Sequence, residues 1–127
     1  MALFLASHWE DGWTVMEIKG ELDTTTAHQL RDFVADVTGR HKHSLDLIAD
    51  LSELTYADVD GLSTLMSIRT LLHEDQGELR LVCPEGRVAR ILRVSKITRV
   101  MPLYPTLAAA LAAPRAVSAD QTGGAGQ

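Results

Sequence analysis

Two segments rich in apolar residues open the chain. Residues 3–9 form a short apolar run, and residues 13–19 alternate strictly between two faces. Between these segments, Glu10 to Gly12 is a three-residue stretch that contains a glycine, as is typical of a hairpin loop. We therefore predict that the chain opens with a β-hairpin.

A helical repeat follows Gly20, which we expect to end the second strand. Apolar residues recur at steps of three and four across residues 24–38 and predict one apolar face on a helix. Asp23 or one of the three threonines after it is the expected N-cap, and Gly39 is expected to end the helix. The predicted apolar stripe consists of Ala27, Leu30, Val34 and Val37.

Predicted strands and helices then alternate to residue 113. The predicted strands cover residues 44–51, 78–83 and 97–103, the last a short edge strand interrupted by Pro102. The predicted helices cover residues 60–74, 87–94 and 107–113, and residues 52–58 are expected to form a loop. This order indicates an α/β fold, with three to four helices packed on a mixed sheet of four to five strands.

The length of 127 residues fits one domain. We assign residues 1–113 to it. Residues 114–127 are rich in alanine, glycine and small polar residues without periodicity, so we predict a disordered tail there.

The charge and the cysteine content narrow the classes of partner. A net charge of −5 argues against a nucleic-acid partner, which requires a basic excess. No apolar run approaches the roughly 20 residues that span a bilayer, so we expect no direct membrane insertion. Cys83 is the single cysteine and is predicted to be a small core residue. One cysteine and no secretory signal indicate the cytoplasm.

Motifs of catalysis are absent from the sequence. Neither glycine-rich phosphate-loop pattern occurs, and His41 and His43 have no further ligand beside them, so we predict no metal site and no cofactor. We therefore expect a binding protein rather than an enzyme. Trp9 and Trp13 flank the hairpin turn, where we expect them to cap the end of the sheet.

Two carboxylates flank the start of the predicted helix 60–74. Asp58 and Asp60 suit N-capping and the helix dipole, and a rigid turn of this kind is also suited to docking. Gly61 either avoids a clash within the fold or lets a partner approach. Upstream, Asp23 is a candidate cap and Glu21 a solvated residue.

Short sequence motifs at the junctions of these elements resemble those of a known family. They are Gly20-Glu21-Leu22-Asp23, Asp50-Leu51-Ser52, Asp58-Val59-Asp60-Gly61-Leu62, Gly77-Glu78-Leu79-Arg80-Leu81-Val82 and Val100-Met101-Pro102-Leu103-Tyr104. In this order and at this spacing, the chain resembles the STAS domain of anti-sigma-factor antagonists from about residue 3 to residue 113.

The resemblance implies a function and a surface. Such antagonists bind an anti-sigma factor, which is also a kinase of the GHKL type, and so release a sigma factor. By this resemblance Glu21, Asp23 and Asp60 form one acidic patch on the partner-facing surface. The residues implied in partner binding are Glu21, Asp23, Asp58, Val59, Asp60, Gly61, Leu62 and Ser63.

The chain departs from the family pattern at the phosphorylated position. The family word is usually Asp-Ser-Ser-Gly-Leu, whose first serine the kinase phosphorylates, whereas Val59 stands in that slot here. Valine has no hydroxyl, so we expect no phosphorylation at the usual acceptor. Ser63 and Thr64 are candidate alternative sites.

The sequence is compatible with two further hypotheses, one about the function and one about the oligomeric state. Related STAS domains are subunits of membrane transporter complexes, such as lipid-transport ATPases. A homodimer is also compatible with the sequence.

Overall fold

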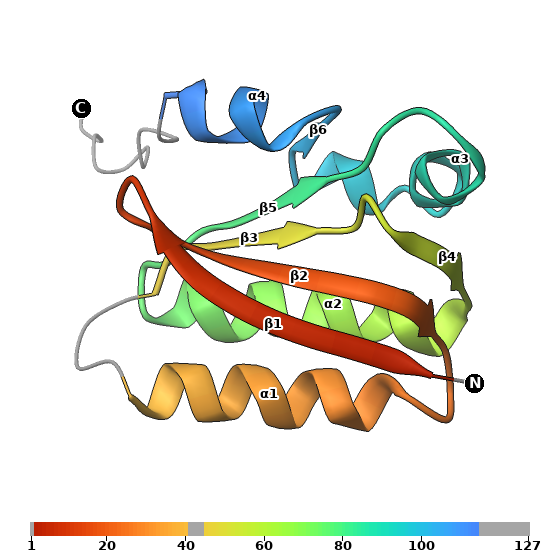
Figure 1. Cartoon of the computed structure of the whole chain (residues 1–127), viewed down its shortest axis with the longest axis horizontal. Coiled ribbons are helices and arrows are strands. Elements are labelled where there is room, and N and C mark those ends of the chain that lie inside the picture. Colours follow the sequence, from red (N-terminus) through yellow and green to blue (C-terminus); the bar gives the residue numbers. More distant parts are fainter. Residues whose placement is uncertain (1, 41–44, 115–127) are drawn as a thin grey trace.

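Six strands form one mixed sheet in the computed structural model, which describes residues 2–40 and 45–114 (Figure 1). The strands are β1 (Leu3–Glu10), β2 (Trp13–Leu22), β3 (Leu47–Asp50), β4 (Leu54–Ala57), β5 (Leu79–Val82) and β6 (Leu103–Tyr104). Their order across the sheet is β1-β2-β3-β5-β6, and β4 pairs with β2. The predicted hairpin is confirmed, because all of β1 pairs antiparallel with residues 13–20 of β2.

The other strand pairs are all parallel. The long strand β2 pairs first with β3 and then with β4, with a shift of register between Gly20 and Glu21. The carboxyl ends of these strands therefore point the same way, and the loops that follow β2, β3 and β5 gather at one end of the molecule (Figure 1).

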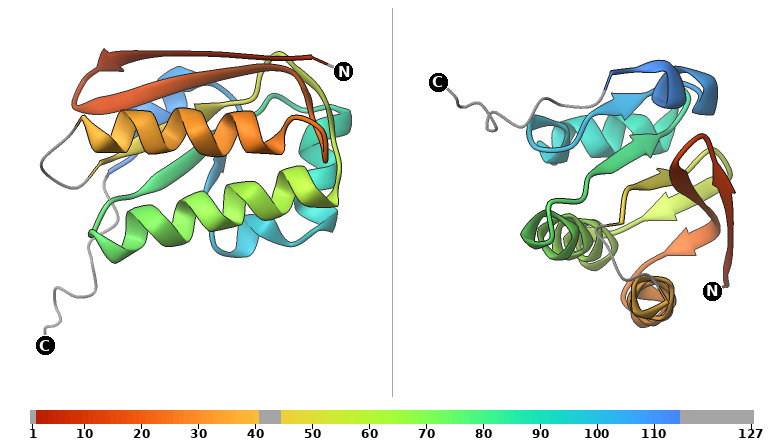
Figure 2. Two further views of the ribbon diagram at one scale, coloured as in Figure 1. Left: turned by 90° about the horizontal axis from the view of Figure 1, so that it is seen from below. Right: turned by 90° about the vertical axis from the view of Figure 1, so that its left-hand side faces the viewer.

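The described residues contain four α-helices, which cover the two faces of the sheet unequally. They are α1 (Ala27–Gly39), α2 (Val59–Glu74), α3 (Arg87–Val94) and α4 (Leu107–Ala112), with a 3₁₀ turn, η1 (Ile97–Arg99), after α3. Helices α1 and α2 lie side by side on one face, whereas the short α4 lies on the opposite face (Figure 2). The predicted stripe of α1 is confirmed: Ala27, Leu30, Val34 and Val37 are all buried.

Alternation along the strands divides the apolar residues between two cores. On β3, Leu47 and Ala49 join the large core under α1 and α2, while Ile48 joins the small core under α4. Trp13 lies in that small core. Cys83 is buried in the large one, as predicted, and burial raises the pKa of its thiol.

A buried arginine ties α4 to the sheet. Arg80 on β5 is only 1% exposed, and its guanidinium forms an ion pair with Glu78. It also donates hydrogen bonds to the backbone carbonyls of Ala110, Ala113 and Pro114. Unpaired carbonyls at a helix end need such donors, so Arg80 serves as a cap for α4. Pro114, which the sequence assigns to the tail, thus contacts the domain.

The predicted α/β class is confirmed, but three predictions at element level are wrong. Residues 52–58 contain the strand β4, so the described sheet has six strands rather than four or five. Residues 97–103 are not one strand: a 3₁₀ turn comes first, and β6 has only two residues. Strand β2 does not end at Gly20, because that glycine adopts a φ of +100° and the chain continues extended to Leu22.

Two further sequence predictions concern side chains near the hairpin and segments beyond the described residues. Trp13 is buried as a cap would be, but Trp9 is exposed to solvent. The His41 to His43 loop and residues 115–127 of the predicted tail lie outside the described residues.

Candidate functional site

The start of helix α2 lies against the turn between β2 and α1. The backbone N–H of Asp58 donates to the carbonyl of Leu22, the last residue of β2, at 3.2 Å. This contact joins segments 36 residues apart and continues the β2–β4 pairing to the edge of the helix. We call the surface formed by Thr24, Asp58, Val59 and Asp60 the α2 corner.

Asp58 caps α2 and holds the turn at the same time. Its Oδ1 accepts a hydrogen bond from the N–H of Gly61 at 2.9 Å, as an N-cap side chain does. Its Oδ2 accepts from the backbone N–H of Thr24 at 3.1 Å. The capping interpretation of Asp58 is therefore confirmed, and the cap also fixes the loop that precedes α1.

Thr24 links the two carboxylates of the corner. Its hydroxyl oxygen lies 2.6 Å from Oδ2 of Asp60 and 3.3 Å from Oδ2 of Asp58. A hydroxyl has one proton to donate, and the shorter distance assigns that proton to Asp60. Both carboxylates are thus held in place, although Asp60 is exposed to solvent.

Val59 stands between these carboxylates with its side chain in solvent. It is the first residue of α2 and is 76% exposed. An apolar side chain so exposed is not explained by packing within the chain. The position that resembles the family's phosphorylation slot is thus accessible, but it carries no hydroxyl.

Gly61 is required by the close approach of α2 to β2. A Cβ atom at this position would lie 2.4 Å from the carbonyl oxygen of Leu22 and 2.8 Å from the Cγ of its side chain. The residue is also buried. Of the two readings of this glycine, avoidance of a clash within the fold is therefore confirmed.

Asp23 turns inward and does not share the surface of the α2 corner. It is 6% exposed, and its Oδ1 accepts from the hydroxyl of Thr25 at 2.7 Å and from the backbone N–H groups of Thr25 and Thr26. The Thr25 hydroxyl is the main reason that the pKa of Asp23 lies below its ordinary value, and burial opposes the shift. The nominal N-cap of α1 is Thr26, whose side chain forms no capping bond.

The candidate alternative phosphorylation sites differ in access. Ser63 is exposed on the first turn of α2. Thr64 is 2% exposed, and its hydroxyl donates to the carbonyl of Asp60 at 2.9 Å and accepts from Arg31 at 3.1 Å. A kinase could reach Ser63 in this fold, whereas Thr64 is enclosed.

The remaining predicted residues border the corner. Glu21 is half-buried on β2 and is paired with Tyr56 of β4. Leu62 is half-buried against the large core. The structure therefore brings Asp58, Val59 and Asp60 together, leaves Glu21 and Leu62 at their border, and turns Asp23 away.

The sequence interpretation missed the role of Thr24. From the sequence, the run Thr24-Thr25-Thr26 is predicted only as a set of candidate caps. A hydroxyl directly after Asp23 was the available signal, but its partner is 36 residues away in the chain. Within residues 2–40 and 45–114, no group of three or more metal-ligating side chains occurs, and none lies at this corner.

Comparison with known proteins identifies the family. A sequence model of the STAS domain matches residues 7–110, which is most of the chain. This protein belongs to the STAS domain family. An anti-sigma F factor antagonist of Paenibacillus polymyxa is 25% identical to this STAS protein over 93 residues, covering 73% of this chain and 79% of that one.

Solved structures agree with the family assignment. The crystal structure of an anti-sigma factor antagonist from Mycobacterium paratuberculosis matches this STAS protein with a TM-score of 0.77 at 27% identity, covering 87% of this chain and 92% of that one. The murine anion transporter Slc26a9 matches with a TM-score of 0.69 at 16% identity, over 82% of this chain and 18% of the transporter. At that identity the transporter shares the fold alone. Among the described helices of this STAS protein, none is long and apolar enough to cross a membrane.

Proposed function

We propose that this STAS protein is an anti-sigma factor antagonist, which binds an anti-sigma factor through the α2 corner and so releases a sigma factor. The observation that carries the proposal is the exposure of Val59 between the fixed carboxylates of Asp58 and Asp60. The names of the Paenibacillus and Mycobacterium relatives support it. The protein would act by binding, without catalysis, in the cytoplasm.

The corner has the chemistry of a protein interface. Val59 offers an apolar contact of the kind that fills a partner's pocket, and the rim carboxylate of Asp60 favours a basic group opposite it. Because Thr24 and the helix cap already hold these groups, little side-chain entropy is lost when a partner docks.

We further propose that binding is not ended by phosphorylation at the family's slot. A phosphate needs a hydroxyl, and Val59 has none. The kinase-type partner expected from the family would then bind this antagonist constitutively. Ser63 is the exposed hydroxyl nearest the slot on α2, so its phosphorylation is the competing reading.

The test uses the anti-sigma factor encoded in the same genome, identified by pull-down with the full chain. Titration calorimetry should give binding to the wild-type protein and a loss of at least about tenfold in affinity for Val59→Glu, because a charge would be buried in an apolar contact. Leu71→Glu is the matched control, since Leu71 is also an exposed apolar residue of α2 but lies toward its other end. Equal affinities of wild type and Val59→Glu would refute the α2 corner as the binding surface.

Phosphorylation is tested with the same pair of proteins. Incubation with ATP followed by mass spectrometry should find no phosphate on the wild-type antagonist and phosphate on Val59→Ser. Stoichiometric phosphate on wild-type Ser63, with release of the partner, would refute constitutive binding.

A further inference from the structure

Positive charge is concentrated in one segment of this acidic protein. The chain has a net charge of −5, yet five of its 12 lysine and arginine residues fall between positions 87 and 99, and no aspartate or glutamate lies among them. All five side chains are exposed. They are Arg87, Arg90 and Arg93 on α3, Lys96, and Arg99 in η1.

The arginines of α3 recur at every third residue and so follow one side of the helix. Both terminal guanidinium nitrogens of Arg93 donate hydrogen bonds to the Glu85 carboxylate, and Nη1 lies 2.9 Å from Oε1. The charged groups of Arg87 and Arg90 form no hydrogen bond or ion pair with any residue in the described part of the chain, nor do those of Lys96 and Arg99. We call this surface, with Val94 and Val100, the basic α3 face.

Two exposed valines lie in the same stretch. Val94 is 75% exposed and Val100 is 42% exposed. A segment that exposes valines among arginines has the composition of a protein interface, in which arginine is enriched and lysine depleted. Four of the five cations are arginines, whose planar guanidinium matches a carboxylate in the way that Arg93 already binds Glu85.

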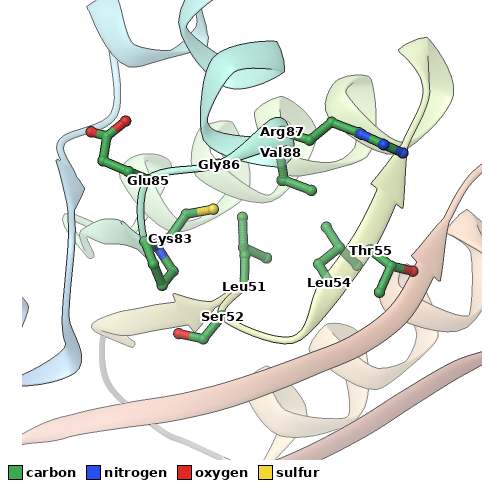
Figure 3. A pocket seen from close by; sticks show the side chains of 10 residues that line it. Leu51, Ser52, Leu54, Thr55, Cys83, Glu85, Gly86, Arg87 and Val88 are labelled. Carbon is green, nitrogen blue, oxygen red and sulfur yellow. The ribbon is translucent and has the colours of Figure 1, made fainter.

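An open groove adjoins the start of α3. It has a volume of about 300 Å³ and lies between the β3–β4 loop and the β5–α3 loop. Leu51, Leu54 and Val88 converge on its interior, while the Arg87 side chain extends along its rim toward the carboxyl end of β4 (Figure 3). The hydroxyl of Ser52 donates a hydrogen bond to the Asp50 carboxylate, and the hydroxyl of Thr55 donates one to the Gly20 carbonyl. The groove therefore offers an apolar floor beside the unpaired cation of Arg87, and its lining carboxylate, Glu85, is already bound by Arg93.

We infer that the groove and the basic α3 face form a docking surface for an acidic segment of a partner protein. An apolar side chain of that segment would enter the groove, and its carboxylates would meet Arg87 and Arg90. This inference rests on the proposed function for the identity of the partner, the anti-sigma factor. The acidic and apolar chemistry of the segment is inferred from the charge of the basic α3 face and the shape of the groove.

The position of the surface favours the same partner. Strand β4 begins at the groove with Leu54 and ends next to Asp58, and four extended residues span about 13 Å. A single protein could therefore contact both the acidic α2 corner and the basic α3 face. Opposite charges at two neighbouring points fix the orientation of a docked protein. A nucleic acid or an anionic membrane presents negative charge to both surfaces and so complements only the basic α3 face, whereas one protein can present an acidic segment to that face and a basic group to the α2 corner.

The test is a double charge reversal, Arg87→Glu with Arg90→Glu. Both side chains are exposed, and acidic residues are compatible with the first turn of a helix, so the fold should be retained. Lys19→Glu with Arg40→Glu changes the net charge equally on other elements and is the control. Affinity is measured for the anti-sigma factor and for a fluorescent peptide rich in glutamate and leucine.

We expect the Arg87/Arg90 variant to lose about tenfold or more in affinity for both ligands and to lose most of the salt dependence of binding. The control should change affinity by less than about threefold. Unchanged binding of both ligands by the Arg87/Arg90 variant would overturn the inference, and so would binding of phosphatidylserine vesicles or duplex DNA more tightly than the peptide.

The outcomes separate the two proposals. If Val59→Glu loses affinity for the anti-sigma factor but the Arg87/Arg90 variant does not, the proposed function stands. The basic α3 face is then not part of the binding surface. If the wild-type protein ignores the anti-sigma factor but binds the peptide through Arg87 and Arg90, the proposed function fails and the docking chemistry stands.

Discussion

The guanidinium carbon of Arg80 lies 4.4 Å from the centroid of the Trp13 ring. A second ring, that of Tyr104, lies 5.7 Å from the same atom. The arginine is thus stacked in the small core while its nitrogens hold the carbonyls at the end of α4. The attachment of α4 to the sheet combines cation–π contact and hydrogen bonding at one residue.

Replacement of Arg80 should therefore weaken the attachment of α4 to the sheet and lower stability more than the replacement of an exposed residue does. We expect Arg80→Met to lower the free energy of unfolding by about 3 kcal/mol, because buried carbonyls lose their donors. Urea denaturation measures the loss, and Trp13 emission in a Trp9→Phe background reports on the small core. Arg93→Met removes an exposed ion pair instead and should cost less than about 1 kcal/mol. Similar losses in the two variants would contradict the role of Arg80.

Two glycines on helices should respond in opposite directions to the same substitution. Gly61→Ala places a methyl group against the backbone of Leu22 and should destabilise the fold by about 2 kcal/mol or more. Gly39→Ala meets nothing within 4 Å at the end of α1 and should stabilise it by about 0.5 kcal/mol. Thermal denaturation of both variants checks the signs, and a stable Gly61→Ala protein would show that α2 can shift away from β2.

The stability contributed by Asp23 should depend on pH. The pKa of Asp23 is lowered in the folded state, so its contribution is complete above the pKa of an unfolded aspartate, about 4. It is lost as the pH falls through the lower folded value. Asp23→Asn should therefore be less stable than wild type near neutral pH, and the gap should narrow as the pH falls below about 4. Urea midpoints across this range provide the measurement, and a gap that does not change with pH would exclude this origin.

Thr24 should stabilise the α2 corner through its hydroxyl. Thr24→Val removes the donor to Asp60 at nearly constant volume and should cost about 1 kcal/mol, whereas Thr24→Ser keeps the donor and should cost less. Chemical denaturation gives both values. A larger loss in Thr24→Ser than in Thr24→Val would attribute the effect to the methyl group instead, because valine keeps that methyl group and serine lacks it.

Local periodicity predicts the helices and strands whose pattern of apolar residues lies within the element itself. The stripe from Ala27 to Val37 predicts α1, because burial of one face determines that pattern. The apolar residues of β2 predict a strand although both of its faces are buried, one in each core. The sequence does not predict strand β4. Its four residues are stabilised by pairing with the carboxyl-terminal end of β2, and no local pattern encodes that pairing.

The same distinction applies to the candidate site. The cap at Asp58 follows from its place at a helix start and was predictable. The inward turn of Asp23 depends on the hydroxyl of Thr25, and the link from Thr24 to Asp60 depends on the approach of two distant segments. A charged residue such as Arg80 is interpretable as buried only when α4 supplies acceptors 30 or more residues away.

The parallel strands also separate the two ends of the molecule. The α2 corner lies where β4 ends and the groove lies where β5 ends, whereas α4 ends at Ala112 near the hairpin turn, at the opposite end of the sheet (Figure 1). A tether or fluorescent label attached after Pro114 would therefore hold the protein with both docking surfaces facing the solution. Surface immobilisation through this end would leave them free to be measured.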